Sequence, residues 1–212
     1  MNGIESILKL SPVVPVLTIE NTEDAVPMIG ALHEGGLRVF EVTLRTTQSL
    51  AAIEAVARAL PDAVVGAGTV LNACDFNQAR DAGARFIVSP GLSDGVLSAA
   101  KASTLAFLPG VTTPGDIMRG LDAGLTHFKF FPAESAGGAK MLQALAGPFA
   151  QVRFCPTGGL TPENAPSYLA LSNVVCIGGT WLAPKTLVAA RDWSQITERA
   201  RAASRLRNTD VA

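Results

Sequence analysis

Lys129 is the residue of this chain whose type and position point most directly to chemistry. It lies in the run Thr-His-Phe-Lys-Phe-Phe-Pro, residues 126–132, where an apolar β-strand is expected. Burial in such a strand removes water from an ammonium group and disfavours its charged form. A neutral lysine amine in a dry pocket attacks carbonyl carbon and forms a Schiff base. The alternative interpretation is that Lys129 ends an edge strand and extends into water.

A second apolar run, residues 39–45, carries two further candidates, Glu41 and Arg45. Side chains alternate across a strand, so Glu41, Thr43 and Arg45 share one face, and the apolar face opposite must pack on helices. Facing inward, Glu41 suits acid–base work, and the forked donors of Arg45 suit a carboxylate. Alternatively, Glu41 and Arg45 form a buried ion pair, which has a large desolvation cost.

The same alternation places His127 and Phe131 on the interior face with Lys129. His127 is interpreted as a packed core histidine rather than a catalytic one. Thr69 ends the run 64–70 and offers a hydroxyl donor near the same place. The small residues 66–68 before it would let a ligand approach the backbone.

Two glycine pairs, Gly158–Gly159 and Gly178–Gly179, follow the last two expected strands. Backbone N–H groups at such turns can point at an anion, and (β/α)8 barrels often bind phosphate after strands seven and eight. The sequence therefore favours a phosphate site there. The alternative is that these glycines only close tight turns.

Eight short β-type runs alternate with amphipathic stretches, and their starts lie roughly 20 to 26 residues apart. The runs are residues 13–19, 39–44, 63–70, 85–89, 105–109, 126–131, 152–156 and 174–177. This pattern predicts an α/β fold, a closed (β/α)8 TIM barrel forming a single domain over residues 1–212. A helix at 4–10 would cover the barrel floor, and a terminal helix would span 192–206. An open doubly wound sheet is the competing fold, but it usually carries a G-x-G-x-x-G fingerprint, which this sequence lacks.

Composition excludes several classes of function. The net charge is −1, and the one basic cluster has the spacing of a solvated helix face, so no nucleic-acid partner is expected; its members are Arg199, Arg201, Arg205 and Arg207. No apolar stretch approaches the roughly 20 residues of a spanning helix, and residues 1–7 do not read as a secretory signal. We therefore expect a cytoplasmic protein without a membrane partner. The three cysteines form no C-x-x-C pair, so no metal site is expected, and Cys155 and Cys176 should pack as small hydrophobes.

The chain resembles the 2-keto-3-deoxy-6-phosphogluconate (KDPG) and 4-hydroxy-2-oxoglutarate aldolase family, whose members are class I aldolases on a (β/α)8 barrel. The segments that carry the resemblance span all but the two ends of the chain. They are residues 12–16 (Pro-Val-Val-Pro-Val), 41–46 (Glu-Val-Thr-Leu-Arg-Thr), 66–70 (Gly-Ala-Gly-Thr-Val), 89–91 (Ser-Pro-Gly), 108–114 (Leu-Pro-Gly-Val-Thr-Thr-Pro), 128–134 (Phe-Lys-Phe-Phe-Pro-Ala-Glu), 156–159 (Pro-Thr-Gly-Gly) and 178–181 (Gly-Gly-Thr-Trp).

The resemblance implies a role for each matching residue. Lys129 would form the Schiff base, and Glu41 would be the general acid/base. The expected substrate-binding residues are Arg45 and Thr69 for the pyruvate carboxylate, and Pro90 and Phe131 for the pocket. The expected phosphate-site residues are Gly158, Gly159, Gly179 and Thr180, with Thr157 linked to stereochemical preference at C4. The family usually has serine where this chain has Thr180, which adds a methyl group to the phosphate pocket.

The expected reaction is reversible cleavage of KDPG to pyruvate and D-glyceraldehyde 3-phosphate, without a metal or organic cofactor. The resemblance also implies a homotrimer. Three alternatives stay open. One is the same chemistry on the C4 epimer, 2-keto-3-deoxy-6-phosphogalactonate, or on 4-hydroxy-2-oxoglutarate. Another is a phosphate-binding barrel epimerase or decarboxylase that uses Lys129 as a charge. The third is a non-catalytic sugar-phosphate binding barrel.

Overall fold

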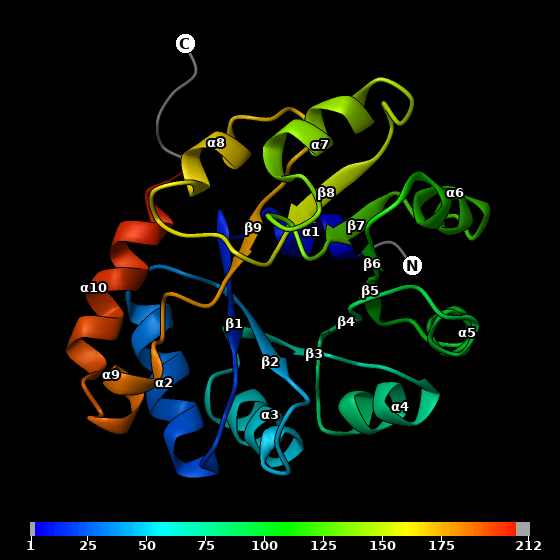
Figure 1. Cartoon of the computed structure of the whole chain (residues 1–212). Coiled ribbons are helices and arrows are strands. Elements are labelled where there is room, and N and C mark those ends of the chain that lie inside the picture. The colour runs from blue at the N-terminus through cyan, green and yellow to red at the C-terminus, as the bar shows by residue number, and fades with distance from the viewer. Residues whose placement is uncertain (1–2, 207–212) are drawn as a thin grey trace.

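The structure, a computed structural model, describes residues 3–206 and has an α/β architecture with strands inside and helices outside (Figure 1). Arg207 and the two extreme ends of the expected domain lie outside the described residues. The strands are β1 (Val13–Leu17), β2 (Val39–Thr43), β3 (Val64–Gly68), β4 (Phe86–Val88), β5 (Ala106–Leu108), β6 (Gly110–Val111), β7 (His127–Phe130), β8 (Arg153–Pro156) and β9 (Ile177–Gly179). The helices are α1 (Ile4–Leu8), α2 (Thr22–Glu34), α3 (Ser49–Ala59), α4 (Ala73–Asp81), α5 (Asp94–Lys101), α6 (Pro114–Asp122), α7 (Gly138–Ala146), α8 (Ala165–Leu169), α9 (Lys185–Ala189) and α10 (Trp193–Ser204).

The strands form two parallel sheets, so the prediction of a closed eight-stranded TIM barrel was wrong. Six strands make a half-barrel in the order β5-β4-β3-β2-β1-β9, and β6-β7-β8 make a second, smaller sheet. Pro109 separates β5 from β6, and a proline has no N–H to donate to a ladder. Between β8 and the β9 region, the described residues pair only through the isolated bridges Phe154–Val174 and Thr157–Gly178.

Two apolar cores lie on opposite faces of the strands. The outer core packs between strands and helices and contains Phe40 and Val42 from β2 with Phe128 and Phe130 from β7. The inner core is a second cluster of buried residues; its members are Ile4, Leu8, Val14, Val39, Val64, Phe86, Val88, Ala106, Leu108, Cys155, Val175 and Cys176. The predicted alternation along β2 and β7 is therefore confirmed.

Helix α1 packs its two buried residues, Ile4 and Leu8, into the inner core. The sequence expectation of a short helix covering the floor is confirmed, although α1 ends at Leu8 rather than at residue 10. Cys155 and Cys176 belong to the same cluster, as expected of cysteines that pack as small hydrophobes.

In the sequence, Thr113 is a capping residue before Pro114 and so predicts a helix start there, which the structure confirms. The side chain of Thr113 accepts a hydrogen bond from the Asp116 N–H at the start of α6, and the Asp116 carboxylate closes a capping box. In the sequence, Thr161 is a capping residue before Pro162 and so predicts a helix start there. That prediction was wrong, because α8 begins after Asn164. Thr161 and Asn164 instead close a turn, in which the Thr161 N–H donates to Asn164 Oδ1 at 2.8 Å. Among the described residues, no helix combines the length and apolar character needed to cross a bilayer.

Candidate active site

Lys129 and Glu41 meet inside the molecule although they come from different sheets. The Nζ atom of Lys129 lies 3.0 Å from Oε1 and 3.3 Å from Oε2 of Glu41. Each residue is only 4% exposed. Lys129 is therefore not an edge-strand lysine that extends into water, and the ion-pair partner of Glu41 is Lys129 rather than Arg45.

Gly68, on the neighbouring strand β3, leaves the space that the side chain of Glu41 occupies. β2 and β3 pair in register, and a Cβ atom at Gly68 would lie 2.1 Å from Oε1 of Glu41. At Gly66, a Cβ atom would lie 2.4 Å from the ring of Phe86. The space beside these two glycines is therefore filled by side chains of the protein itself, Glu41 and Phe86. The expectation that a ligand approaches the backbone of residues 66–68 does not hold at Gly66 or Gly68.

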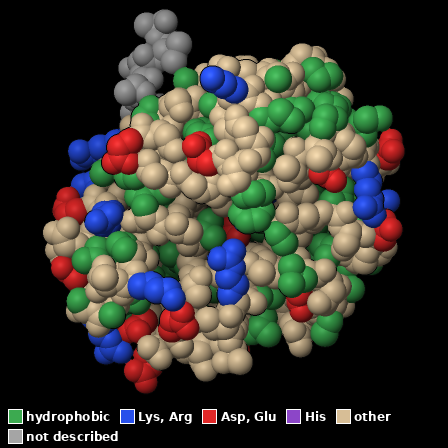
Figure 2. Space-filling model, viewed as in Figure 1, with side chains coloured by type: hydrophobic (Ala, Val, Ile, Leu, Met, Phe, Trp, Pro, Cys, Tyr) green, Lys and Arg blue, Asp and Glu red, His purple; other side chains and the backbone are tan. Residues whose placement is uncertain are grey.

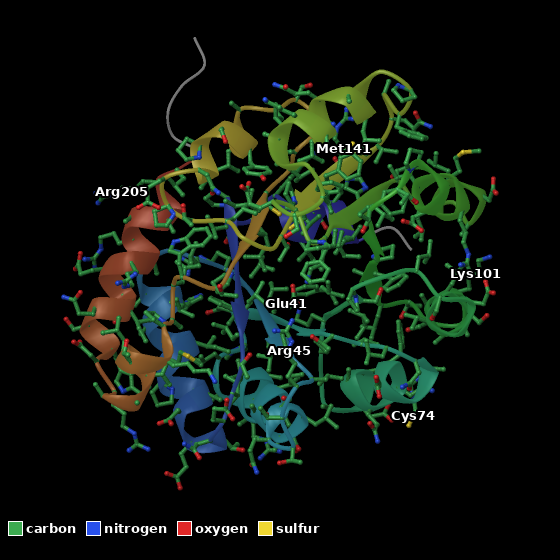
Figure 3. All side chains as sticks on the ribbon, in the orientation of Figure 1. Glu41, Arg45, Cys74, Lys101, Met141 and Arg205 are labelled. Carbon is green, nitrogen blue, oxygen red and sulfur yellow. The ribbon has the colours of Figure 1, made fainter. Side chains whose placement is uncertain are left out.

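Arg45 and Thr69 lie together at the carboxyl ends of β2 and β3. The Nε atom of Arg45 donates to Oγ1 of Thr69 at 3.1 Å. Among the described residues, the two terminal nitrogens of Arg45 have no protein partner, and the side chain is exposed. Its donors are thus available to a carboxylate. Figure 3 labels Glu41 and Arg45 near the centre of the molecule, within the circle of helices.

Thr69 has a strained backbone. Its φ angle is +57°, in the left-handed region that β-branched residues rarely occupy. Strain of this kind costs about 1–3 kcal/mol and is often found at functional sites. The conformation holds the Thr69 hydroxyl against Arg45.

Phe131 and Pro90, the expected pocket residues, flank the lysine strand. The Lys129 Nζ atom lies 5.4 Å from the centroid of the Phe131 ring, in a cation–π geometry. Pro90 follows β4, and its carbonyl group leaves no room for a side chain at Gly110, where a Cβ atom would lie 2.2 Å from that oxygen. Gly110 in turn pairs with Lys129 in the β6–β7 ladder. Pro90 thus packs against the strand beside the lysine.

The first glycine pair forms the expected turn. Gly158 and Gly159 follow β8 with φ angles of +104° and +79°. Only glycine adopts such angles without strain. Gly159 is exposed, and Gly158 is partly exposed.

The second glycine pair lies in a strand rather than in a turn. Gly178 and Gly179 are buried in β9, so the predicted turn at these positions was wrong. Their glycine identity follows from close packing: a Cβ atom would lie 2.3 Å from Thr157 Oγ1 at Gly178, and 1.9 Å from the Trp181 ring at Gly179. Thr157 itself is buried beside Gly178.

A cavity of about 670 Å³ opens between the ends of β1 and β9. Thr18, Thr180 and Trp181 are among the residues that line it, whereas Lys129 and Glu41 are not. Thr180 is exposed, so its hydroxyl can reach a ligand at this mouth. A separate hollow lies near the middle of the face seen in Figure 2, with basic and acidic side chains at it, in the region where Figure 3 labels Glu41 and Arg45.

His127 lies at the opposite end of β7 from Phe131, beside α1, with Glu5 Oε2 4.0 Å from its Nε2 atom. Burial lowers its pKa, and the negative charge of Glu5 opposes that effect. It does not join the Lys129–Glu41 pair.

Sequence reasoning gave no role to Thr18, whose hydroxyl lies 3.2 Å from that of the buried Thr43. Among residues 3–206, no group of three or more His, Cys, Asp or Glu residues could hold a metal ion.

A buried lysine paired with a glutamate, beside an arginine free to bind a carboxylate, is the arrangement of a Schiff-base enzyme. The chain is a class I aldolase. Residues 4–199 match the family model "Aldolase: KDPG and KHG aldolase". This chain belongs to the KDPG and KHG aldolase family.

Individual relatives agree with the family match. The KHG/KDPG aldolase of Escherichia coli K12 is 54% identical over 199 residues, which cover 94% of this chain and 93% of that protein. The 2-dehydro-3-deoxy-phosphogluconate aldolase of Zymomonas mobilis is 50% identical over the full length of both chains. A crystal structure of KDPG aldolase from Legionella pneumophila, with pyruvate captured as a covalent carbinolamine intermediate, superposes with a TM-score of 0.93. It is 45% identical and covers 94% of this chain and 97% of that one.

Proposed function

We propose that this protein reversibly cleaves 2-keto-3-deoxy-6-phosphogluconate to pyruvate and D-glyceraldehyde 3-phosphate. The observation that carries the proposal is the buried contact of 3.0 Å between Lys129 and Glu41. Further support comes from relatives whose names specify this substrate and from the pyruvate adduct of the Legionella pneumophila enzyme.

The proposed chemistry begins with the lysine amine. Glu41 takes a proton from the Lys129 ammonium group, and the neutral amine attacks the C2 ketone to give a carbinolamine. Glu41 gives this proton to the departing hydroxyl, so that loss of water leaves a protonated imine and the Glu41 carboxylate. Glu41 then takes the proton of the C4 hydroxyl, the C3–C4 bond breaks, and its electron pair flows into the imine to give an enamine. Glyceraldehyde 3-phosphate departs, Glu41 returns a proton to C3, and water hydrolyses the imine to pyruvate and free Lys129.

Other residues are proposed to hold the two ends of the substrate. Arg45 and Thr69 bind the carboxylate, because their donors lie together at the strand ends. Phe131 and Pro90 shape the pocket around the reacting carbons. At the far end, the proposed phosphate-site residues are Gly158, Gly159, Gly179 and Thr180, with Thr157 favouring the gluconate configuration at C4.

Trapping with borohydride tests the Schiff base directly. Incubation with pyruvate and borohydride should add one reduced pyruvyl group, located at Lys129 by peptide mass mapping. Lys129→Ala should form no adduct and should retain less than about a hundredth of the turnover rate. Lys140→Ala is the matched control, because Lys140 is an exposed lysine in α7. An adduct at another residue would contradict the proposal.

General acid–base catalysis by Glu41 is tested with Glu41→Gln. This variant keeps the shape of the side chain and should turn over about 10²–10⁴-fold more slowly. Glu54→Gln is a suitable control, because Glu54 lies on the exposed surface of α3 and pairs with Arg58. Full activity of Glu41→Gln would exclude Glu41 as the acid/base.

A second candidate substrate is 4-hydroxy-2-oxoglutarate, which the name of the Escherichia coli relative includes. Steady-state kinetics with KDPG, its C4 epimer and 4-hydroxy-2-oxoglutarate, side by side, decide among the three. The proposed phosphate site predicts the highest kcat/KM for a phosphorylated substrate. A non-catalytic binding protein would bind these ligands without releasing pyruvate.

We also propose a single catalytic domain over residues 1–212, and a homotrimer as the family resemblance implies. Light scattering coupled to gel filtration measures the oligomer directly. The expected mass is three times the 22.0 kDa of one chain. A monomer or dimer at micromolar concentration would contradict this proposal.

A further inference from the structure

Tyr168, the one tyrosine of the chain, pairs with Glu134 beside the proposed phosphate turn. Its hydroxyl donates a hydrogen bond to Oε1 of Glu134. Tyr168 lies in α8 and is 1% exposed, whereas Glu134 follows β7 and is exposed. The aldol mechanism above gives neither residue a role.

Glu134 contacts both glycines of the turn. Its backbone N–H donates to the carbonyl oxygen of Gly158 at 3.1 Å. Its side chain lies so close to Gly159 that a Cβ atom there would be 2.8 Å from both Cβ and Cγ of Glu134. Glu134 therefore fixes the turn through its backbone and its side chain together.

Tyr168 fixes the side chain of Glu134 from the other side. Helix α8 follows the glycine turn in sequence, and it lies near the start of α7 in Figure 1. A Cβ atom at Gly138, the first residue of α7, would lie 3.1 Å from the Tyr168 hydroxyl oxygen and 3.5 Å from Oε1 of Glu134. The hydrogen bond thus joins α8 to the segment after β7, and through the contacts of Glu134 it is coupled to the Gly158–Gly159 turn.

The electrostatic setting keeps Tyr168 a donor. Burial raises the pKa of Tyr168, and the hydrogen bond to Glu134 and the charge of Glu134 raise it further. The hydrogen bond from Tyr168 to Glu134 also affects how a phosphate group can approach the turn. An unrestrained carboxylate beside the turn would repel a phosphate group, whereas the tyrosine hydroxyl holds one carboxylate oxygen toward α8.

We propose that Tyr168 and Glu134 are positioning residues that hold the Gly158–Gly159 turn in the conformation that binds the substrate phosphate. This inference rests on the proposed function, since it assumes that the turn receives a phosphate. Lys129 and Glu41 are held by other contacts, so loss of the Tyr168 hydrogen bond loosens the turn and leaves the Schiff-base pair in place.

The decisive variant is Tyr168→Phe, which deletes one hydroxyl and keeps the ring that fills the core. Its KM for KDPG should rise about tenfold, the effect of one lost hydrogen bond to a charged group. Its kcat, and its kcat/KM for unphosphorylated 4-hydroxy-2-oxoglutarate, should stay within about twofold of the parent values. Glu134→Ala should behave in the same way, whereas Glu134→Gln keeps an acceptor oxygen for Tyr168 and should restore most of the affinity. Glu163→Gln, an exposed charge change just before α8, is the control.

Binding of inorganic phosphate, measured by calorimetry, gives a readout that does not depend on turnover. Tyr168→Phe should weaken phosphate binding about tenfold. An unchanged phosphate affinity, an equal loss on both substrates, or a Glu134→Gln variant as weak as Glu134→Ala would each overturn the inference. Failure of the proposed function is distinguishable, because it would show as absence of the pyruvate–borohydride adduct in the parent protein.

Discussion

The Lys129 ammonium group and the Glu41 carboxylate lie 3.0 Å apart, and each residue is 4% exposed although the two come from separate sheets. A buried ion pair loses most of its hydration, and each charge then depends on the other. The pair therefore links the half-barrel to the three-stranded sheet, and its chemistry and its stability cannot be changed independently.

Removal of either partner should destabilise the protein more than removal of both. Lys129→Met and Glu41→Leu should each lower the free energy of unfolding by about 3–5 kcal/mol, because each leaves a buried charge unpaired. The double variant should lose less than either single variant, because it leaves no buried charge unpaired. Urea denaturation of the four proteins gives the coupling energy; strictly additive losses would contradict an interacting pair.

Arg45→Lys should impair binding of the keto acid although it preserves the charge. A lysine cannot present forked donors to a carboxylate, and it cannot keep the bond from Arg45 Nε to Thr69. The KM should rise about 10- to 100-fold. Arg58→Lys, on the exposed surface of α3, should leave the KM unchanged. Equal KM values for Arg45→Lys and the parent protein would remove Arg45 from the binding site.

Thr69→Asn should stabilise the fold and weaken the enzyme. Asparagine tolerates a φ angle of +57° better than a β-branched residue does, so the free energy of unfolding should rise by about 1 kcal/mol. The lost threonine hydroxyl should raise the KM. Thr104→Asn is the control, since Thr104 is exposed and has an ordinary φ angle. A destabilised Thr69→Asn variant would show that the backbone at this position is not strained.

Two glycine-to-alanine substitutions should change the stability of the protein in opposite directions. Gly159→Ala should destabilise the protein by about 1–3 kcal/mol, because φ is +79° and the new methyl group would meet Glu134 at 2.8 Å. Gly30→Ala in α2 has open space around its Cβ position and should stabilise by about 1 kcal/mol. Thermal unfolding of both variants measures this difference. A stabilising Gly159→Ala substitution would contradict the conclusion that the turn has no room for a side chain at residue 159.

Stability should fall as the pH drops from 7 to 5. Burial lowers the pKa of His127 and of His33 below the ordinary value of 6.5, so the unfolded chain binds more protons in this range. The stabilisation is present above the unfolded pKa and is lost as the pH falls through and below it. His127→Gln should flatten the dependence, as should His33→Gln. The pKa of Asp116 is also lowered, but the stability that this lowering contributes is lost only below the ordinary carboxyl pKa of 3.8. A pH-independent free energy of unfolding between 7 and 5 would contradict this prediction.

The side-chain alternation and most strand positions followed from the sequence. Alternation along β2 and β7 predicted that Glu41 and Lys129 face inward, because an apolar face on each strand must pack on helices. Glycine is also typical of helix ends, and the glycine-ended stretches 33–36 and 122–124 predict such ends from the sequence. In the structure, Gly36 and Gly124 follow α2 and α6 with φ angles of +100° and +78°.

Sequence patterns failed where contacts between distant segments decide the structure. The last expected strand was placed at 174–177, but β9 spans Ile177–Gly179, because Gly178 pairs with Val14 and packs against Thr157. Continuous barrel closure was expected from the strand pattern and from the family resemblance, and neither registers the break at Pro109. The hydrogen bond between Tyr168 and Glu134 joins residues 34 positions apart, so no local sequence pattern predicts it.

The position of α1 has a consequence for the order of events during turnover. Ile4 and Leu8 fill one end of the space between the sheets with apolar side chains, so we expect a ligand to reach Lys129 from the opposite end, where Arg45 is exposed. In the proposed mechanism, a three-carbon fragment tethered to Lys129 would then lie deeper in the molecule than the departing aldehyde. We therefore expect the aldehyde to leave before hydrolytic water reaches the imine, and a high aldehyde concentration to return the enamine to substrate.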